Sequence, residues 1–475
     1  MLVSLFVVVL VFSLFICVAP NGSNGASLEN VVHVKNEAEL KNAVNNAVGS
    51  TIVALNKDII LTGSLNITNN KDITLTSNSR NEFYKLIGAP HQNTIIVEVG
   101  GTLKLDGIVV THSNNEAGRG VKVDIGGTFI LYSGEISGNT ASYNVGDWGG
   151  GVWNWGTFEM YGGKISGNTA SYGGGVVSGG MDGGGNFGLF VMFGGEICGN
   201  NATGGAGSGG VYNVGTFKMS DGKISGNTAY VGGGVLNAGS FSMSGGEISG
   251  NTAATRGGGV WNKVDFAMSG GEISGNTATD SGGGVYNEYS MFLFGDIIYY
   301  NSKVTLTGGK LSSNTANWGG GIGLSYTSGV EGLEQIFVSD GVVFENNCAS
   351  VAYNRNSTHD ALYNSQIGRR VTWTSPFTQG YNNYDIYYTM GTPIDGTDNG
   401  SSGGDGGSSN GNGGSGGNNG NGGSSVGDGF SLKDVVIIFA IVVIIVVGVL
   451  FVYFKKKVAQ LEAKFNTISH GKVET

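Results

Sequence analysis

The chain contains very little proline and little charge. Only 4 of its 475 residues are proline, and none lies between Pro90 and Pro376. Proline has no backbone N–H and is excluded from the interior of β-sheets, so this long stretch is compatible with continuous hydrogen-bonded strands. Charged residues make up 13% of the chain, and the formal net charge is −10. Because nucleic-acid binding needs a basic face for phosphate contacts, this composition argues against a nucleic-acid partner.

Cysteine is also scarce. The three cysteines are Cys17, in an N-terminal apolar run, and Cys198 and Cys348 in the body of the chain. If the repeats described below stack at the usual strand spacing of ~4.8 Å, the two body cysteines lie several repeats apart, beyond the ~7 Å reach of a disulfide. We therefore expect free thiols that fill buried positions, and stability that does not depend on a disulfide framework.

Glycine, in contrast, is abundant, with 89 residues. Much of it belongs to one motif, GGxISGNTAxxGGGVxNxGxFxM, which recurs from about residue 118 to residue 323. The asparagine of its ISGN step falls at Asn139, Asn168, Asn227, Asn251, Asn276 and Asn314, and 251 minus 227 gives 24. A fixed period of this size is typical of a solenoid, in which each repeat buries its apolar face by stacking on its neighbours.

The F-x-M step of each repeat predicts the core. It places two apolar side chains on one face, because successive side chains of a strand point to opposite faces. The members of these columns are Phe158 and Met160, Phe190 and Met192, Phe217 and Met219, Phe241 and Met243, and Phe266 and Met268. An interior filled by such columns has no cavity for a ligand. The asparagines of ISGN and of GGGVxN predict stacked amide ladders at the corners.

A charged column tests the register of the stack. The residue before each I-S-G-N step, or before its variants ICGN and LSSN, runs Glu135, Lys164, Glu196, Lys223, Glu247, Glu272 and Lys310. Opposite charges alternate except at Glu247 beside Glu272. Like charges directly opposite each other are destabilising, so this order favours an exposed, in-register stack of parallel strands.

A second outward column contains the candidate ligand contacts. The residue after the valine of GGGV runs Trp153, Val177, Tyr212, Leu236, Trp261 and Tyr286. If the valines point inward, this column points outward and forms an exposed aromatic stripe, a feature that usually marks an interaction site. The candidate contacts are Trp153, Tyr212, Trp261 and Tyr286, whose rings could stack on sugars. The alternative is an aromatic column that stabilises the sheet or packs beneath inserted loops, which the sequence places near 179–188 and 289–302.

The N-terminal segments predict a leader and a cap. Residues 1–26 have the apolar run and small-residue end of a secretory signal peptide. From Asn36, the segment NEAELKNAVNNAV has apolar residues at helical spacing, with Asn36 as N-cap and Glu39 three residues later. This short helix, followed by irregular strands over 30–117, suits the cap that a solenoid needs at its first hydrophobic end.

The C-terminal segments predict a membrane anchor. The motif decays after residue 323, and residues 324–390 are expected to form the last strands and a C-terminal cap of an ectodomain that spans 27–390. Residues 391–429 form a Gly/Ser/Asn-rich flexible linker. Residues 435–454 are continuously apolar and long enough to cross a bilayer, and three lysines follow at 455–457. The positive-inside rule then leaves the short tail, 455–475, in the cytoplasm and the repeats outside the cell.

The repeats GGEISGNTA and GGGVYN, with the opening NEAELKNAVNNA, resemble adhesin-like surface proteins of methanogenic archaea and some anaerobic bacteria. They are more distantly similar to the polymorphic outer-membrane protein repeats of chlamydiae. The resemblance covers about residues 30 to 390 and implies an all-β fold, a right-handed parallel β-helix of pectin-lyase-like type. The chlamydial pattern differs, because this chain has GGE or GGK before isoleucine and a single predicted transmembrane helix in place of an autotransporter barrel.

Three functions are compatible with this architecture. The first is a membrane-anchored cell-surface adhesin that contacts glycans, host surfaces or other cells, and the second is a passive structural stalk of the envelope. The third, a polysaccharide lyase or hydrolase, needs clustered carboxylates. The aspartates of the repeats are scattered singly, at Asp124, Asp147, Asp182, Asp221, Asp265 and Asp280, and the only arginines there are Arg119 and Arg256. We therefore expect no catalytic residues, no metal and no cofactor, and we favour the adhesin.

Overall fold

The computed structural model describes residues 30 to 350, apart from 80–81, 114–115, 142–146, 181–187, 289, 294–295, 300–301, 325–334 and 340. The predicted signal peptide (1–26), linker (391–429), transmembrane helix (435–454) and tail (455–475) lie outside the described residues, as does most of the predicted C-terminal cap (324–390). Within the described part of the chain, no helix is both long and apolar enough to span a membrane.

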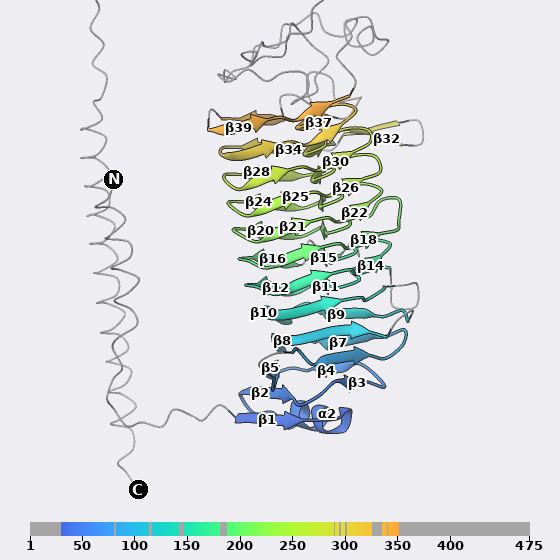
Figure 1. Ribbon diagram of the computed structural model, residues 1–475, viewed down its shortest axis with the longest axis vertical. Helices are drawn as coiled ribbons and strands as arrows, with labels where there is room; N and C mark the ends of the chain where they lie inside the picture. Colours follow the sequence, from blue (N-terminus) through green and yellow to red (C-terminus); the bar gives the residue numbers. More distant parts are fainter. Residues whose placement is uncertain are drawn as a thin grey trace, which may run out of the picture. The chain divides into compact units, whose positions relative to one another are not determined.

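Successive rungs of parallel strands build the described body, and Figure 1 shows them stacked in sequence order. The largest sheet has 21 strands. Its strands are β1 (Asn30–Val34), β2 (Ser50–Leu55), β3 (Ile59–Ile60), β5 (Asp72–Ser77), β6 (Lys85–Gly88), β8 (Thr102–His112), β10 (Thr128–Ser137), β12 (Thr157–Met160), β13 (Lys164–Ser166), β16 (Leu189–Met192), β17 (Glu196–Cys198), β20 (Thr216–Met219), β21 (Lys223–Ser225), β24 (Ser240–Met243), β25 (Glu247–Ser249), β28 (Asp265–Met268), β29 (Glu272–Ser274), β34 (Lys303–Leu306), β35 (Gly309–Ser312), β38 (Ile336–Val338) and β39 (Val342–Glu345).

Two smaller parallel sheets form the other sides of the coil, and the smaller of them begins at Thr169. The ten-stranded sheet contains β4 (Leu65–Ile67), β7 (Asn93–Val97), β9 (Arg119–Val123), β11 (Val152–Asn154), β15 (Val176–Ser178), β19 (Val211–Asn213), β23 (Val235–Asn237), β27 (Val260–Asn262), β31 (Val285–Asn287) and β37 (Ile322–Leu324). The seven-stranded sheet contains β14 (Thr169–Ala170), β18 (Asn201–Ala202), β22 (Thr228–Ala229), β26 (Thr252–Ala253), β30 (Thr277–Ala278), β36 (Thr315–Ala316) and β40 (Cys348–Ala349). An antiparallel pair, β32 (Ser290–Leu293) and β33 (Asp296–Tyr299), occupies the second predicted insertion.

Each rung pairs strand by strand with the next. The rung made of β24, β25, β26 and β27 pairs in parallel with β28, β29, β30 and β31. The result is a nearly closed solenoid of parallel strands with almost no helix, consistent with a β-helix. The prediction of an all-β repeat architecture is confirmed.

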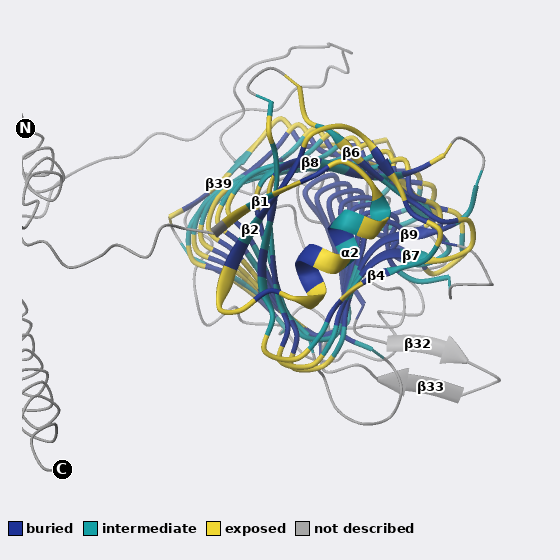
Figure 2. Cartoon of the chain, turned by 90° about the horizontal axis from the view of Figure 1, so that it is seen from below, coloured by how far each residue is buried: buried dark blue, intermediate teal, exposed yellow. Residues whose placement is uncertain are grey.

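One helix, α2 (Glu37–Asn45), lies at the N-terminal end of this solenoid. Asn36 is its N-cap, and the Asn36 side chain accepts a hydrogen bond from the backbone N–H of Glu39 at 2.9 Å. Leu40, Ala43 and Val44 are buried in the same core as the strands. Figure 2, which looks along the coil from this end, shows α2 lying across the opening. The predicted helix and its capping position are confirmed.

Stacked columns fill the core as predicted. Phenylalanine rings from neighbouring rungs lie parallel at centroid distances of 4.6 to 4.9 Å, from Phe129 through Phe158 and onward to Phe266. These rings and the methionines two residues later are at most 1% exposed. Ring stacking and burial in one continuous cluster therefore provide the main hydrophobic stabilisation.

The predicted amide ladder also forms, with buried side chains. In each pair of rungs, the Nδ2 of one asparagine donates to the Oδ1 of the next, for example from Asn251 to Asn276 at 2.9 Å. The backbone N–H of Asn251 donates to the same oxygen at 3.0 Å. Two further members, Asn200 and Asn347, belong to the ladder and were missed in the sequence because their motifs are degenerate. The ladder begins at His112, whose Nδ1 lies 2.8 Å from the Oδ1 of Asn139.

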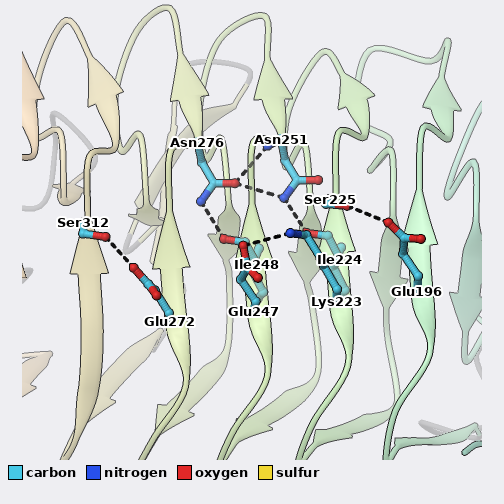
Figure 3. Close-up of polar contacts among 10 residues, drawn as sticks. All are labelled: Glu196, Lys223, Ile224, Ser225, Glu247, Ile248, Asn251, Glu272, Asn276 and Ser312. Carbon is cyan, nitrogen blue, oxygen red and sulfur yellow. Dashed lines mark hydrogen bonds and ion pairs between the residues drawn. The ribbon is translucent and has the colours of Figure 1, made fainter. Parts of the chain in front are cut away.

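The charged column is in register from Glu135 to Lys310, as predicted. Figure 3 shows part of it, including the ion pair between Lys223 Nζ and Glu247 Oε1 at 3.1 Å. Lys164 pairs with Glu196 at 3.5 Å. Where Glu247 and Glu272 are neighbours, Lys310 pairs with Glu272 from the other side at 3.7 Å.

Both body cysteines are free, as expected, but their predicted burial is wrong. Cys198 is half-buried and Cys348 is exposed. Cys198 pairs in register with Ser225, and Cys348 pairs with Thr315. Both therefore belong to columns that face outward, where the period of the strand places them.

Candidate functional site

The predicted aromatic stripe runs in register through the ten-stranded sheet, from Trp153 to Tyr286. Its side chains lie outside the valine-lined core and form a separate cluster. Their exposure, however, contradicts the prediction of an exposed stripe. Tyr212 is 4% exposed, Trp261 7% and Tyr286 1%, while Trp153 is half-buried. Of the four candidate contacts, only Trp153 is accessible to a substantial degree.

The stripe is covered because the corner of each rung folds over it. Trp148 and Tyr172 precede the GGG turns of their rungs, and their rings stack on each other at 4.5 Å. The Trp148 ring also stacks on Tyr212 at 5.6 Å, and Val231 packs into the same cluster. Near the other end of the column, the Lys263 ammonium lies 4.3 Å from the centre of the Trp261 ring. The column is thus a second, smaller core.

A cavity of about 370 Å³ opens at the N-terminal end of this column. Four neighbouring strands of the ten-stranded sheet border it, namely β4, β7, β9 and β11, through their residues or the turns before them. The lining residues are Ser64, His91, Gln92, Asn93, Arg119, Lys122 and Trp153. We refer to this cavity as the Arg119 pocket. Sequence reasoning found only Trp153 among its residues as a candidate.

Arg119 is the most buried of these residues, with no exposed surface. Its Nε donates to the carbonyl oxygens of Trp148 at 2.8 Å and Gly149 at 3.0 Å, and its Nη1 donates to Asn93 Oδ1 at 2.6 Å. Its guanidinium carbon lies 4.5 Å from the centre of the Trp153 ring. Burial lowers the pKa of Arg119 to about 9, so the group remains a cation at neutral pH. Because it is covered, Arg119 contributes its positive charge to the wall of the pocket and holds Asn93 and Trp153 in place.

The accessible lining is polar and tied together by hydrogen bonds. Ser64 Oγ donates to the backbone oxygen of Asn93 at 2.6 Å, and the backbone N–H of Ser64 donates to Gln92 Oε1 at 3.2 Å. Lys122 pairs with Asp124 at 2.8 Å and lies 5.8 Å from the centre of the Trp153 ring. No carboxylate is present among the lining residues of the pocket. The arrangement is suited to binding a polar or anionic group by hydrogen bonds and charge.

A second charged cluster covers the far end of the stripe. Glu288 is 3% exposed and pairs with Lys263 at 3.3 Å. Burial raises the pKa of Glu288, and the nearby Lys263 ammonium opposes this rise. Arg256 pairs with Asp280 at 2.8 Å and lies 5.4 Å from the centre of the Tyr286 ring. These charges cover buried aromatic rings.

The acidic groups of the described residues do not form a metal site. No three histidine, cysteine or acidic side chains in the described ranges lie close enough to hold a metal ion. Asp124 and Asp280 are each held in an ion pair with a neighbouring cation. Asp182 lies outside the described residues.

No protein-family model matches the chain, and neither a curated protein nor a solved structure is significantly similar to it. The geometry of the pocket and the sequence signals on either side of the coil are therefore the basis for a functional assignment.

Proposed function

We propose that the chain is a membrane-anchored cell-surface adhesin or binding protein, and that the Arg119 pocket is its ligand contact. The signal peptide predicted over 1–26 and the anchor predicted over 435–454 support display outside the cell, with the tail at 455–475 inside. The repeat motifs also support a finer assignment of the fold. They resemble those of adhesin-like surface proteins, which implies a right-handed β-helix of pectin-lyase-like type. A passive stalk is the alternative if the pocket takes no ligand.

The observation that carries this proposal is the charge of the pocket. Arg119 and Lys122 border it and no acidic side chain lines it, although the chain as a whole has a net charge of −10. Asp124 pairs with Lys122 at 2.8 Å, so the uncompensated positive charge is that of Arg119. A buried guanidinium in a low-dielectric wall attracts anions more strongly than an exposed lysine does. Gln92, Asn93 and Ser64 supply hydrogen-bonding groups of the kind that sugar hydroxyls need. We therefore assign the pocket to an acidic saccharide.

Stacking on Trp153 is not the expected mode of binding. The Arg119 guanidinium already lies over this ring at 4.5 Å, and the ring of Trp155 packs edge-on against it at 5.0 Å. The ring therefore forms a wall of the pocket rather than an open platform. Recognition then depends on the polar groups around it.

The test is a glycan array of neutral and acidic saccharides probed with the full-length chain. Lys122→Ala removes an accessible cation, and loss of a charge-assisted hydrogen bond of about 1.5–3 kcal/mol should weaken binding by roughly 10- to 100-fold. The control is Lys218→Ala, which removes an exposed lysine from β20 on the large sheet. Binding of no acidic saccharide, or equal binding by the Lys122→Ala variant, would refute the assignment of the pocket.

A further inference from the structure

A row of exposed threonines runs along the outside of the seven-stranded sheet, whose strands β14, β18, β22, β26 and β30 lie one above another in Figure 1. The residues pair in register from rung to rung. They are Thr169, Asn201, Thr228, Thr252, Thr277 and Thr315. We call this set the threonine row. Every member is exposed except Thr169, which is half-buried.

The hydroxyls of this row are held in place and available. The alanine that follows each threonine is buried, for example Ala253 at 0% and Ala278 at 2% exposure, so the threonine side chain must point outward. A β-branched side chain has few accessible rotamers, which limits the positions of its hydroxyl. Within the described residues, the hydroxyls of Thr228, Thr252 and Thr277 make no hydrogen bond. Each can both donate to and accept from a partner.

A strip without side chains borders the row on one side. It consists of the glycines of the SGN turns, such as Gly226 and Gly250, which have φ values of +60°. A Cβ added at either glycine would meet nothing within 4 Å, so the strip is open to solvent. The positive φ explains why glycine is required there, and the consequence is a shallow ledge beside the hydroxyls.

The other side of the row is also uncharged. The next outward residues along the strands include Tyr230, Ala254 and Thr279, all of them exposed. Tyr230 is the largest, with 52% of its surface exposed. The outward residues of this face, from Thr228 and Tyr230 to Thr277 and Thr279, therefore carry hydroxyls, methyl groups and one aromatic ring, and none of them is charged. The nearest charged side chains are those of the Arg256–Asp280 pair, which lies beyond them.

We propose that the threonine row binds a neutral, extended polysaccharide that lies along the coil axis, across the strands. Rungs repeat every ~4.8 Å, which is close to the advance of one sugar ring in an extended β-linked glycan. A linear chain of that period can offer about one hydroxyl to each rung, and the exposed Tyr230 ring lies beside its path. The row lies on a different sheet from the Arg119 pocket, so this site is independent of the proposed function.

Two other occupants fit less well. A flat ice surface would have to clear Tyr230, which projects beside the hydroxyls. A second copy of the chain would need a larger contact area than this face offers. The seven strands, each two residues long, present roughly 200 Å² at the usual strand spacing. A stable dimer buries about 800 Å² on each partner.

The test is co-sedimentation of the full-length chain with suspensions of cellulose and chitin. A triple variant, Thr228→Val, Thr252→Val and Thr277→Val, removes three hydroxyls but keeps β-branched side chains of the same shape. Loss of each hydrogen bond should weaken binding by roughly 2- to 10-fold, so the triple variant should bind at least about tenfold more weakly. Replacement of the same three residues by serine, which keeps the hydroxyls, should retain most of the binding.

The matched control is Thr157→Val with Thr216→Val, two half-buried threonines in a column of the large sheet. These changes should leave binding unchanged, and thermal melting should show that all variants fold. Failure of the unaltered chain to sediment with either polymer, or equal binding by the valine triple variant, would overturn the proposal. Depression of the freezing point of water that depends on the row would also overturn it, in favour of ice. Changes to Lys122 should affect none of these results, which separates this site from the pocket.

Discussion

Replacement of Asn251 by alanine should destabilise the coil strongly, because this side chain makes four buried hydrogen bonds. Its Nδ2 donates to Asn276 Oδ1 and to the backbone oxygen of Ile224, both at 2.9 Å. Its Oδ1 accepts from the backbone N–H of Asn227 at 3.0 Å and from Asn227 Nδ2 at 2.9 Å. Leaving a buried backbone N–H without a partner costs about 1–3 kcal/mol, and the other lost bonds cost about 1 kcal/mol each. The expected loss is therefore at least about 4 kcal/mol.

Hydrogen exchange on the full-length chain measures this loss locally, which matters because a solenoid need not unfold as one unit. About 4 kcal/mol corresponds to a roughly 1000-fold faster exchange of the Asn227 amide. The neighbouring Thr252→Ala change is the control, since that exposed side chain makes no hydrogen bond with described residues, and it should cost less than about 1 kcal/mol. If the backbone amide of Asn227 stays protected from hydrogen exchange in the Asn251→Ala variant, the reasoning is refuted.

Three other changes test the packing and the buried charge. Gly234→Ala should cost about 1–3 kcal/mol in urea unfolding, because its Cβ would lie 2.6 Å from the backbone oxygen of Gly259. Phe241→Ala should cost about 3–5 kcal/mol in the same assay, because it interrupts a stack with rings on both sides. Burial raises the pKa of Glu288 above 4.5, so its contribution to stability is present below that pH and is lost as pH rises through the raised value. The melting temperature of the unaltered chain should therefore fall relative to Glu288→Gln as the pH rises from about 4.5 through this raised pKa, and parallel curves would contradict this assignment.

Features that depend only on the period could be predicted from the sequence. Which residues share a column follows from the 24- or 25-residue spacing, and which side of the strand a column occupies follows from the alternation of side chains. The phenylalanine stack, the amide ladder and the charged column are all of this kind. The register of the charged column from Glu135 to Lys310 could be predicted because a shift of one residue would have moved every charge to the inner face.

The burial of the aromatic column could not be predicted in the same way. Alternation indicates that Tyr212 points away from the lumen, but it does not indicate what lies above that side chain. The cover comes from the corner residues Trp148 and Tyr172, whose positions depend on how the GGG turn folds back. The Arg119 pocket is equally hidden in the sequence, because Ser64 and Gln92 are 28 residues apart on irregular rungs that share no motif.

The two proposed sites use the repeat in opposite ways. Regular rungs present the same side chain at every level of the coil, as in the threonine row. Such a surface is suited to a partner whose own groups repeat at the same interval. A pocket for a single small ligand needs different side chains at neighbouring levels. Ser64, in the turn before β4, Asn93 in β7 and Arg119 in β9 supply these at the N-terminal end of the aromatic column. Since a mutation in a regular rung changes one of several equivalent contacts, its effect on binding should be graded, whereas a single change in the pocket should have a large effect.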